Sequence, residues 1–314
     1  MTAVWVIGSS GLLGAALQRV LQSKNNYIFT PAQRFHWDNE TELNSQLEAA
    51  VKAFSVFVGS GNKWQIYWAA GIGNFASTED ELATETRTLS TLLNLIEAEA
   101  GLASTSGCLA FSSSAGAIYA GSKDDIISEN TVVSPTTDYA REKLKQEKLL
   151  SNFGQKNNNI TVLLARISTL YGPGQATGKR QGLLAHIARC MLRNQSVHIY
   201  VPLDTIRDYI TADDAASMMM ASMSALSGNH GVFTKIIASE KATTIAEIVS
   251  VFNRIARRKP RIVASASKLS SLYSRRIQFR SIAVPINEQV SRTSLLVGIA
   301  QVLSAERSSF TRVH

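Results

Sequence analysis

Two side chains that could together move a proton lie four positions apart in this chain. Tyr139 and Lys143 enclose the segment Tyr-Ala-Arg-Glu-Lys, and residues four apart share one face of a helix. A phenol with a pKa of about 10 is a poor base at neutral pH, but an adjacent ammonium stabilises its phenolate. The pair is a candidate acid/base, although Lys145 and Lys148 nearby are also consistent with an ordinary solvated helix face.

Three consecutive serines precede this segment. Ser112, Ser113 and Ser114 close a short apolar run that begins at Cys108. A serine hydroxyl at the end of a strand can hydrogen-bond a substrate hydroxyl or carbonyl oxygen. One of these serines could therefore complete a hydrogen-bonding pair with the tyrosine.

A glycine-rich segment follows the first apolar run, Val4–Ile7. Gly8 permits a tight turn, Gly11 lets the backbone approach a pyrophosphate at a helix N-terminus, and Gly14 lets the helix pack closely on the sheet. This strand–turn–helix context predicts dinucleotide binding, whereas a tight turn with nothing bound is the alternative. The expected cofactor-binding residues of the turn are Gly8, Ser10, Gly11, Leu12 and Gly14.

The residues after the second predicted strand bear on which dinucleotide is bound. NAD sites usually carry an acidic residue about 20 positions after the glycines, where it binds the ribose 2′-hydroxyl. Here Phe29–Arg34 contains no acid, and Asp38 is the first one. Arg34 could pair with a 2′-phosphate, which favours NADP over NAD, but a solvated surface arginine is the alternative.

Strands that alternate with helices must position these groups. Such alternation is typical of βαβ units with a parallel sheet and right-handed crossovers. Short apolar runs predict strands at Val4–Ile7, Tyr27–Thr30, Gln65–Ala70, Cys108–Ser112, Ile160–Ala165 and Val197–Val201. Helical periodicity begins at Leu12 and recurs over Leu43–Phe54, Glu79–Glu99, Asp138–Leu150, Gly182–Leu192 and Thr211–Leu226. No element is assigned beyond Leu226.

The composition excludes several classes of protein. The 314 residues are 45% hydrophobic, which is enough for a sizeable core. No apolar run reaches the roughly 18–20 residues of a membrane span, and no secretory signal is evident. Cys108 and Cys190 cannot form a disulfide framework, and the five histidines lack metal-ligand spacing. We expect a reduced, cytoplasmic protein without a metal; Asp213 and Asp214 are better explained by a helix N-terminal dipole than by a metal.

The charge is divided unevenly along the chain. Residues 1–150 hold 11 basic and 16 acidic side chains, whereas residues 151–314 hold 21 and 8. A basic second half indicates an anionic ligand, nucleic acid or a membrane surface. The cluster Arg257–Arg261 keeps nucleic acid open, but no recognition helix or aromatic-interleaved basic motif supports it.

Six segments, in chain order, resemble the extended short-chain dehydrogenases/reductases, specifically the NAD-dependent epimerase/dehydratase group that acts on nucleotide sugars. They are Val6–Gly14, Ala69–Gly71, Phe111–Tyr119, Tyr139–Lys143, Arg166–Gly174, and Arg207–Ile210 leading to Asp213–Ala215. The resemblance implies an α/β fold with a Rossmann-type doubly wound parallel sheet over residues 1–165, to which some later segments return. Residues 166–314 would mainly form a smaller C-terminal α/β substrate-binding domain.

The resemblance also implies roles for the candidate residues. Tyr139 would be the acid/base, and Lys143 would hold the nicotinamide ribose and depress the tyrosine pKa. Ser114 would bind the reacting oxygen, with Ser113 as the alternative one register away. The remaining implied contacts are Ala69, Ala70 and Gly71 on the cofactor and Thr169 and Arg207 on the substrate.

Arg207 would bind the substrate diphosphate, the alternative being an ion pair with Asp204 or Asp208. Arg275, Arg276 and Arg280 are candidates for a second phosphate contact, and a solvated face explains them equally well. The implied reaction is hydride transfer at a sugar carbon, with the tyrosine moving the proton on its oxygen.

The chain departs from the family pattern in ways that bear on the reaction. Family dehydratases carry an Asp-Glu pair after the strand-end hydroxyl residue, and Ala115 and Gly116 stand there instead, which disfavours water elimination. Many epimerases have Asn where this chain has Thr169. A 4-epimerase and a 4-keto reductase both remain open, and a non-catalytic NAD(P)-binding regulator or scaffold is the alternative function. The resemblance further implies a homodimer through Glu79–Glu99 and the helix that carries Tyr139.

Overall fold

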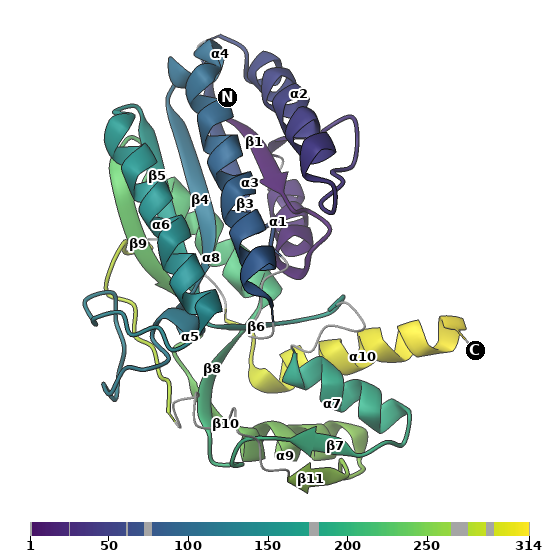
Figure 1. The fold of residues 1–314 in the computed structure, drawn as a ribbon. Helices are drawn as coiled ribbons and strands as arrows, with labels where there is room; N and C mark the ends of the chain where they lie inside the picture. The colour runs from purple at the N-terminus through teal and green to yellow at the C-terminus, as the bar shows by residue number, and fades with distance from the viewer. Residues whose placement is uncertain are drawn as a thin grey trace.

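The larger part of the molecule is built around a parallel sheet with helices packed against it (Figure 1). The computed structural model describes residues 2–24, 26–60, 62–71, 77–175, 182–264, 276–286 and 292–313. The sheet has six strands in the order β2-β1-β3-β4-β5-β9, and every neighbouring pair is parallel. The strands are β1 (Thr2–Ile7), β2 (Tyr27–Phe29), β3 (Lys63–Trp68), β4 (Gly107–Ser114), β5 (Ile160–Ile167) and β9 (Gly231–Ile237). The expected Rossmann-type sheet is confirmed.

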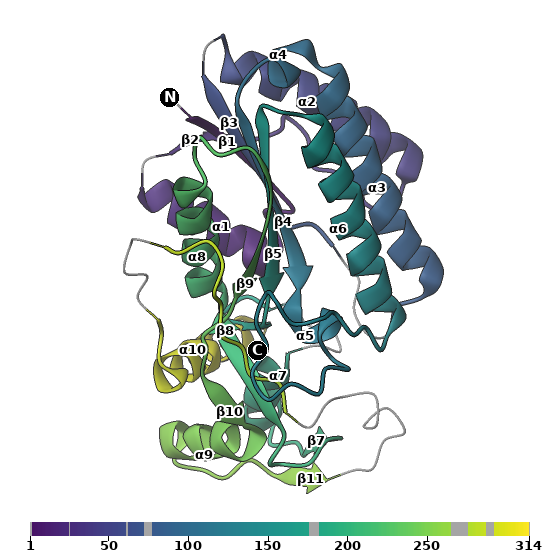
Figure 2. The same cartoon turned by 90° about the vertical axis from the view of Figure 1, so that its left-hand side faces the viewer.

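Helices cover both faces of this sheet, as Figure 2 shows. In β1, Val4 and Val6 pack into the core under α1 and α8, whereas Trp5 and Ile7 pack under α2, α3 and α6 on the opposite face. Because both faces are buried, the strands are apolar at consecutive positions. The helices of this part are α1 (Leu12–Ser23), α2 (Glu40–Val58), α3 (Glu79–Ala98), α4 (Ala100–Ala103), α5 (Ala115–Ile118), α6 (Asp138–Lys156) and α8 (Ala212–Ala225).

The smaller part lies beyond the carboxyl ends of the parallel strands (Figures 1 and 2). It has a three-stranded sheet in the order β10-β8-β6 and a two-stranded parallel sheet of β11 and β7. Ile187, Ile248, Phe252 and Ile299 are fully buried in its own core. Its elements are β6 (Thr169–Tyr171), α7 (Leu183–Leu192), β7 (Val197–Ile199), β8 (Ile206–Thr211), β10 (Ala242–Thr244), α9 (Ile245–Ala256), β11 (Ile262–Ala264) and α10 (Leu295–Val313).

The segment 276–286 ties the two parts together. Phe279 forms a bridge with Ile127, in the loop after α5, and Arg276 forms one with Ile206 at the start of β8. β9 and α8, both from beyond residue 166, lie with the large sheet. The division of the chain near residue 165 stays a prediction.

The predicted elements are found at the expected places, with shifted ends. The helix predicted over Leu43–Phe54 spans Glu40–Val58, because the Asn39 side chain caps it by accepting from the Glu42 amide. The strand predicted to end at Ser112 continues to Ser114. The elements that were not predicted are β6, β8, β9, β10, β11, α4, α5, α9 and α10. Among the described residues, none of the helices is both long and apolar enough to cross a membrane.

Gly107, at the start of β4, tests how tightly this sheet is packed. A β-carbon at residue 107 would overlap the indole ring of Trp64, which is fully buried and donates from Nε1 to the Leu102 carbonyl at 3.2 Å. Gly107→Ala should therefore lower the free energy of unfolding by about 1–3 kcal/mol, measured by urea denaturation. Gly116→Ala is the matched control, because no atom lies within 4 Å of the added carbon. Equal stability of the two variants would contradict this packing.

Candidate active site

The glycine turn after β1 packs against the end of β3. Gly8 has φ +86°, and a β-carbon there would lie 2.5 Å from the Ala70 nitrogen. The Ala69 amide donates to the Ile7 carbonyl at 2.9 Å, which holds the two strand ends together. A β-carbon on Gly14 would overlap the Gly8 carbonyl, so α1 packs directly on the turn. Contacts within the chain therefore explain two of the three glycines.

Gly11 differs from these two, because no contact within the chain requires a glycine there. Its φ is −74°, and the nearest atom to an added β-carbon is the Gly8 carbonyl oxygen at 3.4 Å. Gly11 is the N-cap of α1, no side chain caps this helix, and Ser9, Ser10 and Gly11 are exposed. An uncapped helix N-terminus behind an open glycine turn fits the pyrophosphate of a dinucleotide.

The order of the strands puts this turn at the switch point of the sheet. In a sheet ordered 2-1-3-4-5, ligands bind at the carboxyl ends where the chain direction reverses, between β1 and β3. Gly8–Gly14 follows β1, and Ala69, Ala70 and Gly71 follow β3. All the cofactor residues expected from these two segments, Ser10 and Leu12 included, therefore lie at one place.

Arg34 lies in the loop between β2 and α2. Its side chain is exposed, and within the described part of the chain it has no ion-pair partner. The next acid, Asp38, is also exposed in this loop.

Ser114, Tyr139 and Lys143 come together beyond the end of β4. The Tyr139 hydroxyl hydrogen-bonds the side chain of Ser114, the last residue of β4. The Lys143 ammonium lies 5.8 Å from the centre of the Tyr139 ring and 5.1 Å from that of Phe111. Thr137 caps α6 by accepting from the Ala140 amide, which starts the helix so that Tyr139 lies in its first turn. The two side chains that the sequence spacing predicted to share a helix face thus lie close together in the structure.

The ammonium of Lys143 is shared with two side chains outside the predicted set. Its Nζ donates to Gln146 Oε1 at 2.9 Å and lies 3.7 Å from Glu85 Oε2 on α3. Burial lowers the pKa of Lys143, and the Glu85 carboxylate opposes this shift. Glu85 also lies beside Gly71, whose added β-carbon would be 3.4 Å from both carboxylate oxygens.

The pKa of Tyr139 is raised above its ordinary value, whereas the resemblance implied that it would be lowered. Burial raises the pKa of this phenol, the charge of Glu85 raises it further, and the hydrogen bond with Ser114 opposes the rise. Because Lys143 faces Glu85, its positive field at the phenol is partly offset. In the ligand-free chain the tyrosine is therefore held in its protonated form.

Ser113 faces away from this group. Its Oγ donates to Glu147 Oε1 at 2.6 Å in a buried network. Arg166 on β5 donates to both Glu147 oxygens, at 3.0 and 2.6 Å, and to the Tyr119 hydroxyl. The structure thus places Ser114, and not Ser113, next to Tyr139, and gives Ser113 another partner.

Sequence reasoning did not single out Glu147 and Arg166, although both had a signal. Glu147 is four residues beyond Lys143 and therefore on the same helix face. Arg166 is the next-to-last residue of the mostly apolar strand β5 and pairs in register with Ser113. A charged residue in each of two buried elements indicates a mutual ion pair.

Thr169 and Arg207, the predicted substrate contacts, lie on neighbouring strands of the smaller part. Thr169 is exposed at the start of β6 and pairs with Tyr209 of β8. The half-buried Arg207 donates from Nη1 to the Ile206 carbonyl at 2.7 Å. The carboxylate of Asp208 accepts from Ser168, Ser239 and the Lys241 amide, at distances of 2.6 to 3.1 Å. Asp208 is therefore committed to other donors.

The remaining candidates have local explanations or fall outside the described residues. Asp213 pairs with Arg19 at 2.6 Å, and Asp214 accepts from Thr293, so both carboxylates are engaged by protein groups. No cluster of metal-ligating side chains occurs within the described ranges. Arg276 lies 3.9 Å from Asp125, Arg280 is exposed, and Arg275 lies outside the described residues.

Comparison with known proteins identifies a protein family that this chain matches. The model of the NAD dependent epimerase/dehydratase family matches residues 4–233. A dTDP-4-dehydro-6-deoxyglucose reductase of Escherichia coli is 28% identical over 145 residues, which are 46% of this chain and 44% of the relative. A dTDP-L-rhamnose 4-epimerase of Burkholderia thailandensis is 27% identical over 124 residues, 39% of this chain and 33% of the relative. The chain thus matches less than half the length of either relative.

Solved structures resemble the whole chain. MoeE5 in complex with UDP-glucuronic acid and NAD has a TM-score of 0.79 at 19% identity, covering 98% of this chain and 99% of that one. RMD from Pseudomonas aeruginosa complexed with NADPH has a TM-score of 0.75 at 20% identity, covering 98% and 100%. These likenesses show the fold. Because the family model spans well over half of the residues, the chain belongs to the NAD dependent epimerase/dehydratase family.

Proposed function

We propose that this chain is an NAD(P)-dependent enzyme that transfers a hydride at a sugar carbon of a nucleotide sugar, as a 4-epimerase or a 4-keto reductase. The observation that carries the proposal is the meeting of Ser114, Tyr139 and Lys143 beside the glycine turn. A chain that only bound a dinucleotide, as a regulator or scaffold, would not need an acid/base group at that place.

The cofactor would lie across the switch point. The turn Gly8–Gly14 would hold the pyrophosphate at the N-terminus of α1, and Ala69–Gly71 would line the dinucleotide. Lys143 would hold the nicotinamide ribose, taking hydroxyl groups in place of part of its present contacts with Gln146 and Glu85. When bound, the nicotinamide supplies or accepts the hydride. Arg34, exposed after β2, favours NADP.

Proton transfer would fall to Tyr139. In reduction the phenol gives its proton to the sugar oxygen, and in oxidation the phenolate takes it back. Ser114, which already hydrogen-bonds this tyrosine, would bind the same oxygen. Ala115 and Gly116 of α5 follow this serine, so no carboxylate stands there to assist loss of water.

The nucleotide-sugar part would extend toward the smaller part of the molecule. Arg207 would bind the diphosphate and Thr169 the sugar, from neighbouring strands β8 and β6. The relatives named for dTDP-sugar substrates and MoeE5, solved with UDP-glucuronic acid, support a nucleoside-diphosphate sugar as the substrate class.

Replacing the tyrosine hydroxyl separates catalysis from binding. Tyr139→Phe should lower cofactor-dependent conversion of a nucleotide sugar by about 10²–10⁴-fold, because the proton donor is lost. Cofactor affinity, measured by fluorescence titration of NAD(P)H, should change less than about threefold. Tyr200→Phe, at a side chain 55% exposed in the smaller part, is the control. Unchanged turnover in Tyr139→Phe would exclude the proposed mechanism, and no turnover of any nucleotide sugar by the wild type would favour the regulator.

The pH dependence should differ between the two directions of reaction. Since the pKa of Tyr139 lies above its ordinary value, only a small phenolate fraction exists at neutral pH, and that fraction grows as the pH rises. Oxidation needs the phenolate, so its rate should rise by about tenfold per pH unit toward the alkaline pKa. Reduction needs the phenol, so its rate should stay level and fall only above that pKa. Initial rates in both directions test this, and an oxidation rate independent of pH would contradict Tyr139 as the base.

Arg34 should discriminate between the two cofactors. Arg34→Ala should weaken NADP(H) binding by about tenfold, or about 1.4 kcal/mol, because a charge-assisted contact with the 2′-phosphate is lost. NAD(H) binding should not change. Isothermal titration calorimetry with both cofactors measures the difference, with Arg193→Ala, an exposed arginine of the smaller part, as the control. Equal loss for both cofactors would rule out this role.

A further inference from the structure

A cavity of about 340 Å³ opens beside β9, at the edge of the large sheet. Its walls come from Met218 of α8, Lys235 of β9, Glu240, the segment 281–286 and Arg292. None of the active-site residues described above lines it. The volume is within the usual range for small-molecule sites.

Lys235 is a buried ammonium without a carboxylate in contact. Its side chain lines the cavity, and the residue is only 5% exposed. Nζ donates to Ser281 Oγ at 3.1 Å and to the Ala283 carbonyl at 2.8 Å, which are both neutral acceptors. Among the described residues, Lys235 has no acidic partner within ion-pair distance. Buried charges are normally paired, so within the described part of the chain this ammonium lacks the counterion expected of it.

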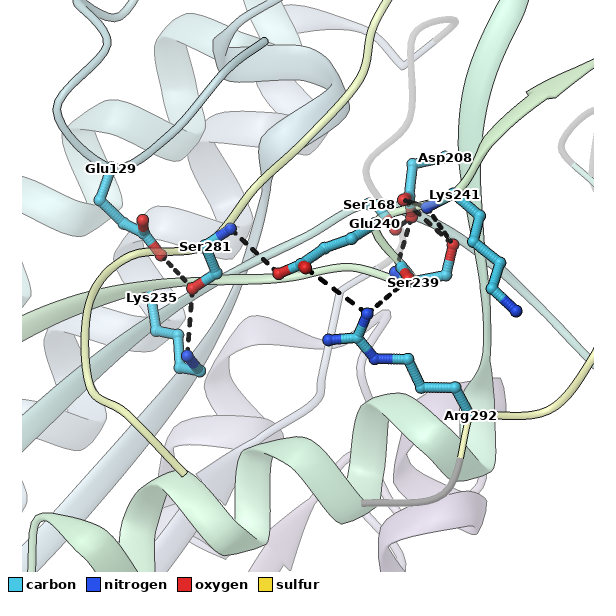
Figure 3. A network of polar contacts seen from close by, with 9 residues as sticks. All are labelled: Glu129, Ser168, Asp208, Lys235, Ser239, Glu240, Lys241, Ser281 and Arg292. Atoms are coloured by element: carbon cyan, nitrogen blue, oxygen red, sulfur yellow. Dashed lines mark hydrogen bonds and ion pairs between the residues drawn. The ribbon is translucent and has the colours of Figure 1, made fainter. Parts of the chain in front are cut away.

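The two nearest acids are engaged by other groups (Figure 3). Glu129 accepts from the Ile236 amide at 2.7 Å, from Ser281 Oγ at 2.6 Å and from the Ile282 amide at 2.9 Å. Glu240 accepts from the Ser281 amide at 3.1 Å and lies 3.5 Å from Arg292 Nη1. These carboxylates hold Ser281 and Ile282 in place, and neither of the two lies within ion-pair distance of Lys235.

Arg292 brings a second cationic group to the same cavity, and this group is paired with Glu240 at 3.5 Å. Its Nη1 donates to the Ser239 carbonyl at 2.8 Å, and its other nitrogens make no contact with the described residues. Burial lowers the pKa of Lys235 and the charge of Arg292 lowers it further, while Glu129 and Glu240 oppose the shift. Figure 3 shows the two cationic ends on either side of Ser281 and Glu240.

We propose that this cavity is a second ligand site, separate from the active site, for a small molecule with one carboxylate or phosphate group and a short apolar body. The anionic group would bind at the Lys235 ammonium, with the Arg292 guanidinium on the same cavity wall, and would serve as a counterion to the ammonium. The apolar body would rest on Met218, Ile282 and Ile286, which line the rest of the cavity. This site goes beyond the proposed hydride transfer and does not depend on it.

Binding should be linked to protonation of Lys235. Because the empty cavity disfavours the ammonium, an anion beside Nζ raises the pKa of Lys235 and draws a proton from the buffer at alkaline pH. The observed heat of binding then depends on the ionisation heat of the buffer. A nonspecific surface contact would not give this signature.

Calorimetry of the full chain with two probes, sodium butyrate and inorganic phosphate, tests the site. We expect saturable one-to-one binding of at least one probe, with proton uptake at alkaline pH. Which of the two probes binds shows whether the site takes a carboxylate or a phosphate group. Arg292→Gln and Lys235→Met should each weaken this binding by at least about tenfold. Arg254→Gln, which removes an exposed charge on α9, should leave it unchanged.

Several outcomes would overturn the site. Failure of both probes to bind saturably would do so, as would equal affinity in the wild type and in Arg292→Gln. Equal weakening by Arg254→Gln would show that only net charge matters. Circular dichroism monitors folding, and if Lys235→Met does not fold, the half-exposed Arg292 position decides the question alone.

Discussion

The buried ion pair of Arg166 and Glu147 fixes the geometry on which the active site depends. It joins β5 to α6 through two hydrogen bonds, and Ser113 of β4 donates to the same carboxylate. α6 carries Tyr139 and Lys143, and β4 carries Ser114. A buried charged pair adds little net stability, but loss of one partner leaves an unpaired charge and is strongly destabilising. The pair therefore sets the relative position of the helix and the strand end rather than strengthening the core.

Two buried lysines in the chain face different electrostatic conditions. Lys143 has Glu85 at 3.7 Å and Gln146 at 2.9 Å, so its charge is compensated before any ligand arrives. Lys235 has only neutral acceptors within contact distance among the described residues. The compensation at Lys143 has a consequence for chemistry, because the same Glu85 helps to keep Tyr139 protonated. Burial and the charge of Glu85 together therefore favour the phenol form of Tyr139 over the phenolate.

Much of the site could be predicted from the sequence, because its signals are local. The glycines at 8, 11 and 14 and the spacing of Tyr139 and Lys143 reflect a turn and one helix face, which short-range patterns encode. The resemblance pointed to Ser114 with Ser113 as the alternative. The residue pattern alone could not separate the two, since neighbouring strand residues face opposite sides and the end of β4 lay two residues further than expected. Glu85 could not be found either, because its contact with Lys143 joins two helices far apart in the sequence. The strand β9 was not predicted because its first four residues are only half-buried, so its sequence lacks the continuous apolar run that marks a fully buried strand.

The positive charge of the second half has several local explanations in the fold. Arg258 donates to the Met191 carbonyl at the end of α7, and Arg254 and Arg257 lie at the end of α9, where the helix dipole favours cations. Arg189 pairs with Glu306 of α10 at 3.7 Å. These arginines make contacts at helix ends or between helices. The number of basic residues in the second half is therefore weak support for nucleic-acid binding. The informative cations are those that lie near a proposed ligand: Arg207 beside the proposed substrate path, and Lys235 with Arg292 around a cavity. An excess of cations in this chain therefore indicates small anionic ligands more directly than a polyanionic surface.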